Sequence, residues 1–511
     1  MALKAAANAS VPAAGQMDPA PGSAAPSPRV GFLILFVLTA GALLLRILHL
    51  TSRSFTLDEG FSIFLARTSF AEFARTIWNG ELNMALYYAA LRLWVHLSSS
   101  EFAIRILSVA FGVATVIVVC FLGLRLFSRR AGIVAAVLML VHPAHIALSQ
   151  DARSYSLTVL LVSLSSLLFL RTLQHPSFPS GIGYATVSAF AVYSHFFAML
   201  VILAQVLSLL FTNVDPRTRK ILLMTALLLA VLTAPIALFL ARGPRLELAW
   251  VPTLHAQQFS GLLYFLTLSR LRCLTYLALW GAALVAAISR RHNHAATWGY
   301  WFVMSWLFVP VAVTVIVSVM RPLLVERFLA ICIPPSVLLA AAGFDYLLSS
   351  LRWVGAAALL LLVLYSARSV RFFYAHPDIN EDWRGATGYI LAHAQTTDEV
   401  VVLPAYARFT VDYYRDILGG NVPDVRITSV EPPALASPLP EGLWFVSSDF
   451  PKVGAGEAEV EDFVKMHREY CGVPPATFTR VRVWEFRKCK AEYDAVPPGQ
   501  LNPVPWSSPT R

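Results

Sequence analysis

The sequence predicts a polytopic α-helical membrane protein with a soluble α/β domain near its carboxyl-terminal end. Of the 511 residues, 57% are hydrophobic and only 14% are charged, whereas a soluble domain has about 25% charged residues. Apolar runs long enough to cross a bilayer recur up to residue 371. Nineteen of the 30 acidic residues lie beyond that point. Together these observations exclude an ordinary cytosolic enzyme.

Charge and motif content exclude further classes. The net charge of +10 favours anionic lipid or phosphate partners over nucleic acid, because apolar helices leave little surface for a basic groove. The sequence lacks GxxxxGK[ST], HExxH and GxSxG, and no GxGxxG follows an expected strand. ATPases, zinc peptidases, α/β-hydrolases and dinucleotide enzymes therefore lose support. Five cysteines without CxxC spacing exclude a zinc ribbon and a disulfide scaffold.

The chain begins with a tail and continues with a series of membrane spans. Residues 1–29 are rich in Ala, Pro, Gly and Ser, which predicts a disordered tail. Val30–Leu50 is longer than the apolar part of a cleavable signal and predicts a first span. We expect about 11 transmembrane helices in a membrane domain over residues 30–371, with further apolar runs at 103–124, 131–149, 154–171, 181–194, 196–212, 221–241, 273–289, 297–319, 327–348 and 353–371.

Loop charges indicate an orientation. Leu82–Leu97 is helical in pattern but short and interrupted by Arg92 and His96, so we expect it to lie flat on the membrane surface. The basic loops then all fall on the side of the amino terminus, which basic residues mark as cytoplasmic; they are 124–130, 215–220 and 289–294. An odd number of spans places the part of the chain beyond residue 371 outside the cell.

Residues 372–490 predict an extracytoplasmic α/β domain, and residues 491–511 form a Pro-rich tail. The strand pattern occurs at Val400–Leu403, Val425–Thr428, Leu443–Ser447 and Phe478–Phe486, and the helical pattern at Glu457–Tyr470. If Cys471 ends that helix and the last strand runs back along it, Cys489 lies about 20 Å from Cys471. A disulfide needs Cα atoms within about 7 Å, so the two cysteines are predicted to stay unpaired.

Acidic residues of the membrane domain gather on one side. Eight of its ten carboxylates fall at outer ends or outer loops: Asp58, Glu59, Glu72, Glu81, Glu101, Asp151, Glu247 and Glu326. Carboxylates near lipid are costly and usually face a cavity or a partner, which predicts a polar chamber there. For Glu72, Glu101 and Glu247 a solvated loop charge is the better interpretation.

Three regions among these contain candidate catalytic or phosphate-binding residues. Asp58 and Glu59 follow the first span directly. Asp151 and Arg153 lie between two spans with almost no loop, where a structural ion pair explains them equally well. Arg321 and Arg327 flank an outer helix start, and guanidinium groups bind phosphate bidentately, although a helix-end ion pair is as common. His142 and His145 are one turn apart, which permits metal binding but favours hydrogen-bonded groups at a helix end.

Several motifs, in order, resemble the bacterial GT-C glycosyltransferases. They are TLDEGFS, ELNMALYYAALRLWVHL, EFAIRILSVAFGV, RLFSRRAGIVAAVLMLVHPAHIALSQDARSYSL, AVYSHFFAMLVILAQ and VERFLAICIPPSVLLAAAG, within residues 30–345. The nearest group is the family 39 type, which includes protein O-mannosyltransferases, lipid A aminoarabinose transferases and rhizobial lipopolysaccharide galacturonosyltransferases. EDWRGATGYI resembles the start of the exported domain that many of these proteins carry.

The resemblance implies roles for individual residues. The implied catalytic residues are Asp58, Glu59 and Asp151. Asp58 and Glu59 match the family's acid pair, whose first member is taken as the catalytic base, and Asp151 matches the acid of the second motif. The implied donor-phosphate ligands are Arg153, Arg327 and Arg321, and the implied substrate-cavity residues are Glu81, Tyr87, Tyr155 and His195. The family often has Pro-Pro where this chain has Met84-Ala85, which puts the surface helix and Glu81 in question. No cofactor is implied with certainty, and a divalent metal between Glu81 and His195 stays an open alternative.

The resemblance also implies a function and a location. The expected protein lies in the bacterial inner membrane, among membrane lipids. It moves a sugar from a polyprenyl-phosphate donor to a hydroxyl of an extracytoplasmic lipid, glycan or protein, with inversion. A sugar on a lipid phosphate already has a good leaving group, so the reaction needs a carboxylate base and cations for the phosphate, and no ATP. The alternatives are a transporter or flippase for lipid-linked sugars and an O-antigen ligase or polymerase.

Overall fold

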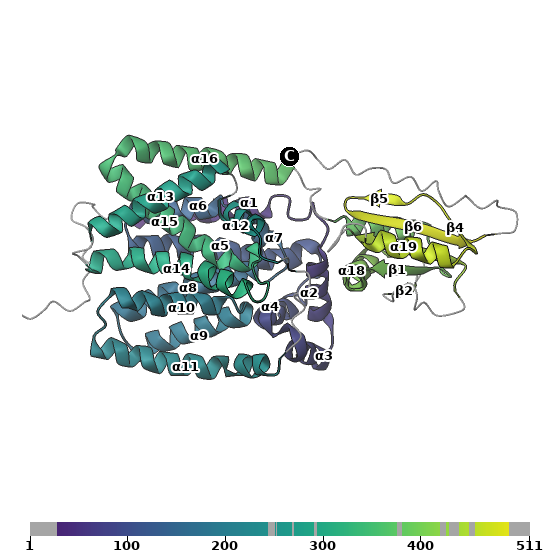
Figure 1. Cartoon of the computed structure of the whole chain (residues 1–511), viewed down its shortest axis with the longest axis horizontal. Helices are drawn as coiled ribbons and strands as arrows, with labels where there is room; N and C mark the ends of the chain where they lie inside the picture. Colours follow the sequence, from purple (N-terminus) through teal and green to yellow (C-terminus); the bar gives the residue numbers. More distant parts are fainter. Residues whose placement is uncertain are drawn as a thin grey trace, which may run out of the picture. The chain divides into compact units, whose positions relative to one another are not determined.

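The computed structural model describes residues 28–243, 251, 253–267, 270–290, 294–375, 381–419, 426–428, 439–448 and 455–489. Helices dominate it (Figure 1). The predicted disordered tails, except for residues 28 and 29, and Glu247 lie outside the described residues. The chain divides into two compact units. The membrane unit comprises residues up to Leu50 and Thr68–Ala375, and the C-terminal unit comprises Thr51–Arg67 and the chain from His376 onward.

The membrane unit confirms the polytopic helical prediction. Among the described residues, eight helices are long and apolar enough to cross a membrane, and a bent pair makes a ninth span. The eight are α1 (Pro28–Ile47), α5 (Glu101–Leu126), α8 (Tyr155–Gln174), α11 (Pro216–Ala241), α13 (Arg270–Ser289), α14 (His294–Ser318), η4 with α15 (Glu326–Cys332 and Ile333–Ser350) and α16 (Arg352–Ala375). The bent pair is α6 (Arg129–Leu140) and α7 (Pro143–Gln150), at 56°.

The predicted count of about 11 spans exceeds the eight or nine found in the described part of the chain. The two runs on either side of His195 form the shorter helices α9 (Phe178–Ser194) and α10 (Ala198–Ser208), the latter extended by the 3-10 turn η3 (Leu209–Phe211). Leu82–Leu97 is helical as predicted, as η2 (Leu82–Met84) and α4 (Ala85–Trp94).

Polar residues mark the two helix breaks. At the first, Pro143 opens α7 and the His142 ring accepts a hydrogen bond from the amide of His145, which caps the new helix. At the second, His195 adopts an extended backbone after α9, and the amide of Phe196 donates to the side-chain oxygen of Asn83 at 2.8 Å. Each break therefore gives its freed backbone group a side-chain partner inside the apolar unit.

Helix α15 lies at the centre of the membrane unit. Its residues Ile333–Phe344 are all buried, which fits a helix that is apolar on every side. By contrast, α1, α11 and α16 carry many exposed large apolar side chains, as expected of helices that face lipid. Helix α9 packs against both α8 and α11, and α10 packs against α14 (Figure 1).

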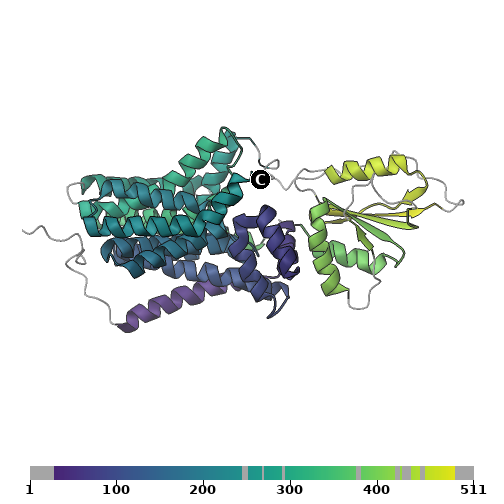
Figure 2. The ribbon, with the colours of Figure 1, turned by 90° about the horizontal axis from the view of Figure 1, so that it is seen from below.

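The C-terminal unit contains one mixed sheet. The strands lie in the order β2 (Arg426–Thr428), β1 (Glu399–Leu403), β3 (Gly442–Ser448), β6 (Val481–Lys488) and β4 (Tyr470–Gly472), and β5 (Ala476–Phe478) also pairs with β6. β1 runs parallel to β2 and β3, with Val401 opposite Phe445, whereas β6 is antiparallel to its neighbours. Figure 2 shows α19 (Ala455–Met466) on one side of the sheet and α17 (Trp383–His393) and α18 (Arg408–Leu418) on the other.

Successive side chains along the strands point to opposite faces of the sheet, and those on one face form the core with α19. Val401, Leu403 and Phe445 face α19, where Phe463 lies 4.9 Å from the Phe445 ring centroid. Trp444 points to the opposite face and contacts Tyr389 of α17. The predicted soluble α/β domain is thus confirmed, with its first three strands close to the predicted positions.

Two predicted elements of this unit are wrong in part. The strand expected at Phe478–Phe486 is a hairpin, because Arg480 adopts a positive φ of 55° and turns the chain between β5 and β6. The helix expected at Glu457–Tyr470 ends at Met466. The chain then forms β4, whose Cys471 is paired with Arg487 of β6.

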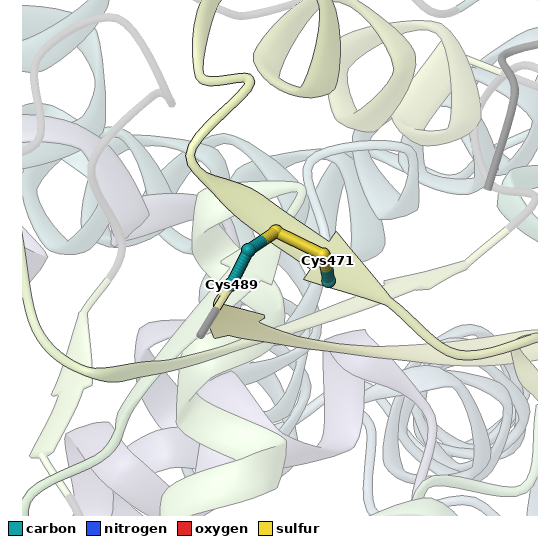
Figure 3. The surroundings of a disulfide bond; sticks show 2 residues. All are labelled: Cys471 and Cys489. Carbon is teal, nitrogen blue, oxygen red and sulfur yellow. A yellow bond between two sulfur atoms is a disulfide. The ribbon is translucent and has the colours of Figure 1, made fainter. Parts of the chain in front are cut away.

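This strand overturns the prediction that Cys471 and Cys489 stay unpaired. The two residues form a disulfide with a Cα–Cα distance of 5.3 Å (Figure 3). The predicted distance of about 20 Å assumed a helix through Cys471. Because that residue lies in a strand next to β6, Cys489 follows the end of β6 at bonding distance.

The two units do not follow chain order. Residues 51–67, here called the acid segment, were assigned from sequence to the membrane domain 30–371, but they belong to the C-terminal unit. Their helix α2 (Leu57–Arg67) packs against α18. The acid pair Asp58–Glu59 therefore folds with residues more than 300 positions later in the chain.

Candidate active site

Asp58 and Glu59 lie in the first turn of α2 but have different surroundings. The carboxylate of Glu59 accepts hydrogen bonds from the amide and hydroxyl of Thr56 at 2.9 and 3.3 Å, and the Thr56 hydroxyl accepts one from the Glu59 amide at 3.3 Å. This reciprocal pattern is a capping box, in which Thr precedes Glu by three residues. Glu59 is fully buried, whereas Asp58 is half-buried. Of the two acids, Asp58 is therefore the more accessible to a substrate.

A third carboxyl group lies near Asp58 in the same unit. Burial raises the pKa of Glu381 above its usual value, and the charge of Asp58 acts in the same direction. The indole of Trp383 opposes this shift by donating to the Glu381 carboxylate at 2.8 Å. Sequence reasoning did not select Glu381, although it begins the EDWRGATGYI segment.

In the membrane unit, a line of hydrogen bonds joins Glu81 to Arg153. The Tyr88 hydroxyl donates to the Glu81 carboxylate at 3.1 Å and accepts from the Arg153 guanidinium at 3.2 Å. Glu81 ends the π-helical turn η1 (Ile77–Glu81), and Tyr88 lies one turn into α4. Arg153 lies in the tight turn between α7 and α8, where its amide donates to the carbonyl of half-buried Asp151 at 2.8 Å.

Arg153, Tyr155, His195 and Arg327 come together from three segments, and we call them the cationic cluster. The ring of Tyr155, at the start of α8, lies 5.9 Å from the His195 ring, which lies 5.1 Å from that of Phe328. Both guanidinium groups are close enough to act electrostatically on the His195 imidazole.

His195 is the buried centre of this cluster. Its exposed fraction is 2%, and its Nδ1 accepts a hydrogen bond from the Phe197 amide at 3.3 Å. Its Nε2 is buried and makes no hydrogen bond to the residues that the structure describes. A buried ring nitrogen without a protein partner, beside two guanidinium groups, is what a site for an anionic oxygen ligand would present.

Other predicted site residues lie elsewhere. Arg321 is exposed, between α14 and η4. Tyr87 is completely buried, and its hydroxyl forms a hydrogen bond of 3.0 Å with Ser108 of α5. The adjacent Tyr88, which sequence reasoning did not select, is the tyrosine that contacts Glu81 and Arg153. Neighbouring helix positions point about 100° apart, and the sequence held no signal that separated the two.

His142 and His145, at the junction of α6 and α7, are both hydrogen-bonded within the protein. His142 Nε2 is bonded to the Leu266 carbonyl at 3.0 Å, and His145 Nδ1 to the Arg46 guanidinium at 2.7 Å. These are contacts of hydrogen-bonded groups at a helix end. Within the described ranges, no group of three or more His, Cys, Asp or Glu side chains is placed to hold a metal ion.

Residues 84–239 match the model of the dolichyl-phosphate-mannose-protein mannosyltransferase family. No curated protein matches the chain significantly by sequence.

Several solved structures are similar over most of the chain. ArnT from Cupriavidus metallidurans, bound to undecaprenyl phosphate, is 15% identical with a TM-score of 0.58 and covers 89% of this chain and 98% of its own. The oligosaccharyltransferase AglB from Archaeoglobus fulgidus, with an inhibitory peptide and a dolichol-phosphate, is 11% identical with a TM-score of 0.53 and covers 92% and 75%. The mycobacterial arabinofuranosyltransferase AftD is 14% identical with a TM-score of 0.50 and covers 90% and 42%. The chain therefore has the fold of the GT-C membrane glycosyltransferases.

Proposed function

We propose that the chain is a membrane glycosyltransferase that moves a sugar from a polyprenyl-phosphate donor to a hydroxyl group of an acceptor. The observation that carries this proposal is the cationic cluster, where the Nε2 of buried His195 has no hydrogen-bond partner among the described residues. The His195 ring lies 5.9 Å from that of Tyr155, two residues after Arg153, and 5.1 Å from that of Phe328, next to Arg327. The match of residues 84–239 to a mannosyltransferase family supports the proposal, as does the undecaprenyl phosphate bound by the similar ArnT.

The proposed reaction needs one base and a site for phosphate charge. The acceptor oxygen attacks the anomeric carbon, and the bond from that carbon to the phosphate oxygen breaks with its electron pair left on the phosphate. The acceptor proton passes to the Asp58 carboxylate. Arg153 and Arg327 stabilise the charge that grows on the leaving phosphate. A single displacement of this kind inverts the configuration of the sugar.

We propose supporting roles for the residues around the cationic cluster. The hydrogen bond from Arg153 to Tyr88, which in turn donates to Glu81, fixes one guanidinium for phosphate binding. Asp151, the half-buried acid two residues before Arg153, serves as a second carboxylate for the sugar or acceptor. Tyr155 and His195 line the cluster through their rings. We assign no role to a metal ion.

We further propose that the reaction takes place on the extracytoplasmic side of the bacterial inner membrane, with a lipid, glycan or protein as acceptor. The disulfide between Cys471 and Cys489 supports an outside position for the C-terminal unit, because such bonds persist in oxidising compartments and are rare in the cytosol.

The test is transfer of label from a polyprenyl-phosphate sugar pool in membranes that contain the protein. The unmodified protein is expected to transfer the label, and Asp58→Asn to lower the rate at least about 100-fold, the usual contribution of a general base. Glu72→Gln is the control, since Glu72 is exposed and should leave the rate unchanged. No transfer by the unmodified protein would favour a transporter, and near-normal transfer by Asp58→Asn would remove Asp58 as the base.

A further inference from the structure

Side chains of α18 form hydrogen bonds to the backbone of the acid segment. The Tyr414 hydroxyl accepts from the Phe55 amide at 2.7 Å, and the Thr410 hydroxyl donates to the Thr56 carbonyl at 3.3 Å. Both partners belong to α18. These bonds engage the two residues that precede α2, which carries Asp58 in its first turn.

Helix α17 holds the earlier part of the segment. The Arg384 guanidinium donates to the carbonyls of Thr51 and Arg53 at 3.0 and 3.3 Å. The Ser54 hydroxyl donates to the Glu381 carbonyl and accepts from the Trp383 amide at 3.2 Å. Backbone groups of Thr51, Arg53, Phe55 and Thr56 are thus bonded to side chains of α17 and α18.

Aromatic side chains of the acid segment also pack against α18. Phe55 is fully buried, with its ring 4.9 Å from Tyr413. On the far side of Asp58, the Phe64 ring lies 4.3 Å from Phe409.

Gly60 shows how closely α2 approaches α18. A Cβ at this position would lie 2.0 Å from the Thr410 hydroxyl oxygen and 2.8 Å from Thr410 backbone atoms. Only glycine permits this approach. The backbone is therefore fixed two residues before Asp58, at Thr56, and two residues after it, at Gly60.

We propose that Tyr414 and Thr410 of α18 are positioning residues for the Asp58 carboxylate. The inference rests on the proposed function, because it concerns the carboxylate named there as the base. These two side chains hold the backbone that presents it. A base works only at hydrogen-bond reach of the acceptor hydroxyl, so a displacement of about 1 Å can cost up to about 100-fold in rate. Two side chains of α18 would thus affect turnover without taking part in the reaction themselves.

The test compares three variants of the full-length protein in detergent or nanodiscs. Tyr414→Phe removes the acceptor for the Phe55 amide, and Thr410→Val removes the donor to Thr56 while keeping the side-chain shape. Tyr389→Phe is the matched control, because it makes the same chemical change on α17, where the ring packs against Trp444 and Phe478 of the sheet. Amide hydrogen exchange of a peptide covering residues 51–67 is measured for each, together with kcat, KM for the donor and Tm.

We expect both α18 variants to speed exchange in the acid segment, to lower kcat about tenfold and to leave KM for the donor within about twofold. Tyr389→Phe should leave both exchange and kcat unchanged. Unaltered exchange in Tyr414→Phe and Thr410→Val would overturn the anchoring. Faster exchange with unaltered kcat would overturn the positioning role. Failure of the unmodified protein to transfer sugar would count against the proposed function alone, since the exchange comparison does not depend on transfer.

Discussion

Asp58 and Glu59 are adjacent in the sequence, but their side chains have different surroundings. Glu59 satisfies the amide and hydroxyl of Thr56 and is fully buried. The sequence pattern Thr-Leu-Asp-Glu already contains this capping box. Adjacent acids in a motif therefore need not share one function, and we propose the more accessible carboxylate, that of Asp58, as the base.

Glu59→Gln tests that division. Glutamine serves at this position of a capping box as well as glutamate does, so we expect transfer within about threefold of the unmodified rate and a loss of stability of less than about 1 kcal/mol. Transfer rate and Tm are the measurements. A loss as deep as that of Asp58→Asn, with unchanged Tm, would instead make Glu59 a catalytic residue.

Arg327 and Arg321 form a second natural comparison, six residues apart. Arg327 is half-buried and directly precedes Phe328, whose ring lies 5.1 Å from that of His195, whereas Arg321 is exposed. In the proposed reaction the charge of Arg327 meets the phosphate before and during transfer. Arg327→Ala is therefore expected to weaken donor binding and to lower kcat, with a loss in kcat/KM of about 100-fold or more.

Arg321→Ala is the matched control and should change kcat/KM by less than about threefold. The measurement is the transfer rate at varied concentrations of a polyprenyl-phosphate sugar. Equal losses in the two variants would show that general positive charge, rather than the cationic cluster, governs donor binding.

At the scale of elements, a buried carboxylate ties three strands of the sheet together. Asp398, just before β1, accepts hydrogen bonds from Trp444 of β3 at 3.0 Å and from Arg487 of β6 at 2.9 and 3.1 Å. Burial alone would raise the pKa of Asp398, but the bonds from the Gln395 amide, Trp444 and Arg487 outweigh it and hold the pKa below its usual value.

The sign of the resulting pH dependence comes from this shift. Because the folded state lowers the pKa, the contribution of Asp398 to stability is complete above its unfolded pKa of about 4 and is lost as pH falls through the lower folded value. Asp398→Asn should remove that acid-sensitive part and destabilise the C-terminal unit at pH 7 by about 2 kcal/mol, less than for a fully buried pair because Arg487 is half-exposed.

Thermal unfolding between pH 3 and pH 7 measures both effects of Asp398→Asn. Glu441→Gln provides the comparison, because its ion pair with Lys488 is exposed and should contribute little. A variant as stable as the unmodified protein at pH 7 would show that the Asp398 network adds no net stability.

At the scale of the whole molecule, the disulfide bears on topology. Cys471 and Cys489 should react with a maleimide only after reduction, and a reductant that cannot cross membranes should suffice in intact spheroplasts. Buried Cys120 and Cys332, which are free thiols, provide the control and should react after denaturation without reduction. Labelling of Cys471 and Cys489 without reduction would contradict the bond and remove its support for an extracytoplasmic C-terminal unit.

The amino-acid sequence by itself determined the class of fold and most of the elements. Apolar runs and strand alternation depend on residues a few positions apart, so α5, α8, β1 and β3 could be predicted close to their observed bounds. Their places at helix ends singled out Arg153 and Arg327, where a polar residue is costly unless it has a function. Tyr155 and His195 were selected only by the resemblance to the GT-C glycosyltransferases.

Only the tertiary structure decided which of these residues meet, and which of them hold others in place. Tyr88 rather than Tyr87 contacts Arg153 because of its helix face, and Cys471 reaches Cys489 because a strand of three residues replaces the end of a predicted helix. The Phe55 amide and the Tyr414 hydroxyl are 359 residues apart. That bond uses a backbone donor present in nearly every residue, so it leaves no mark on the sequence at position 55.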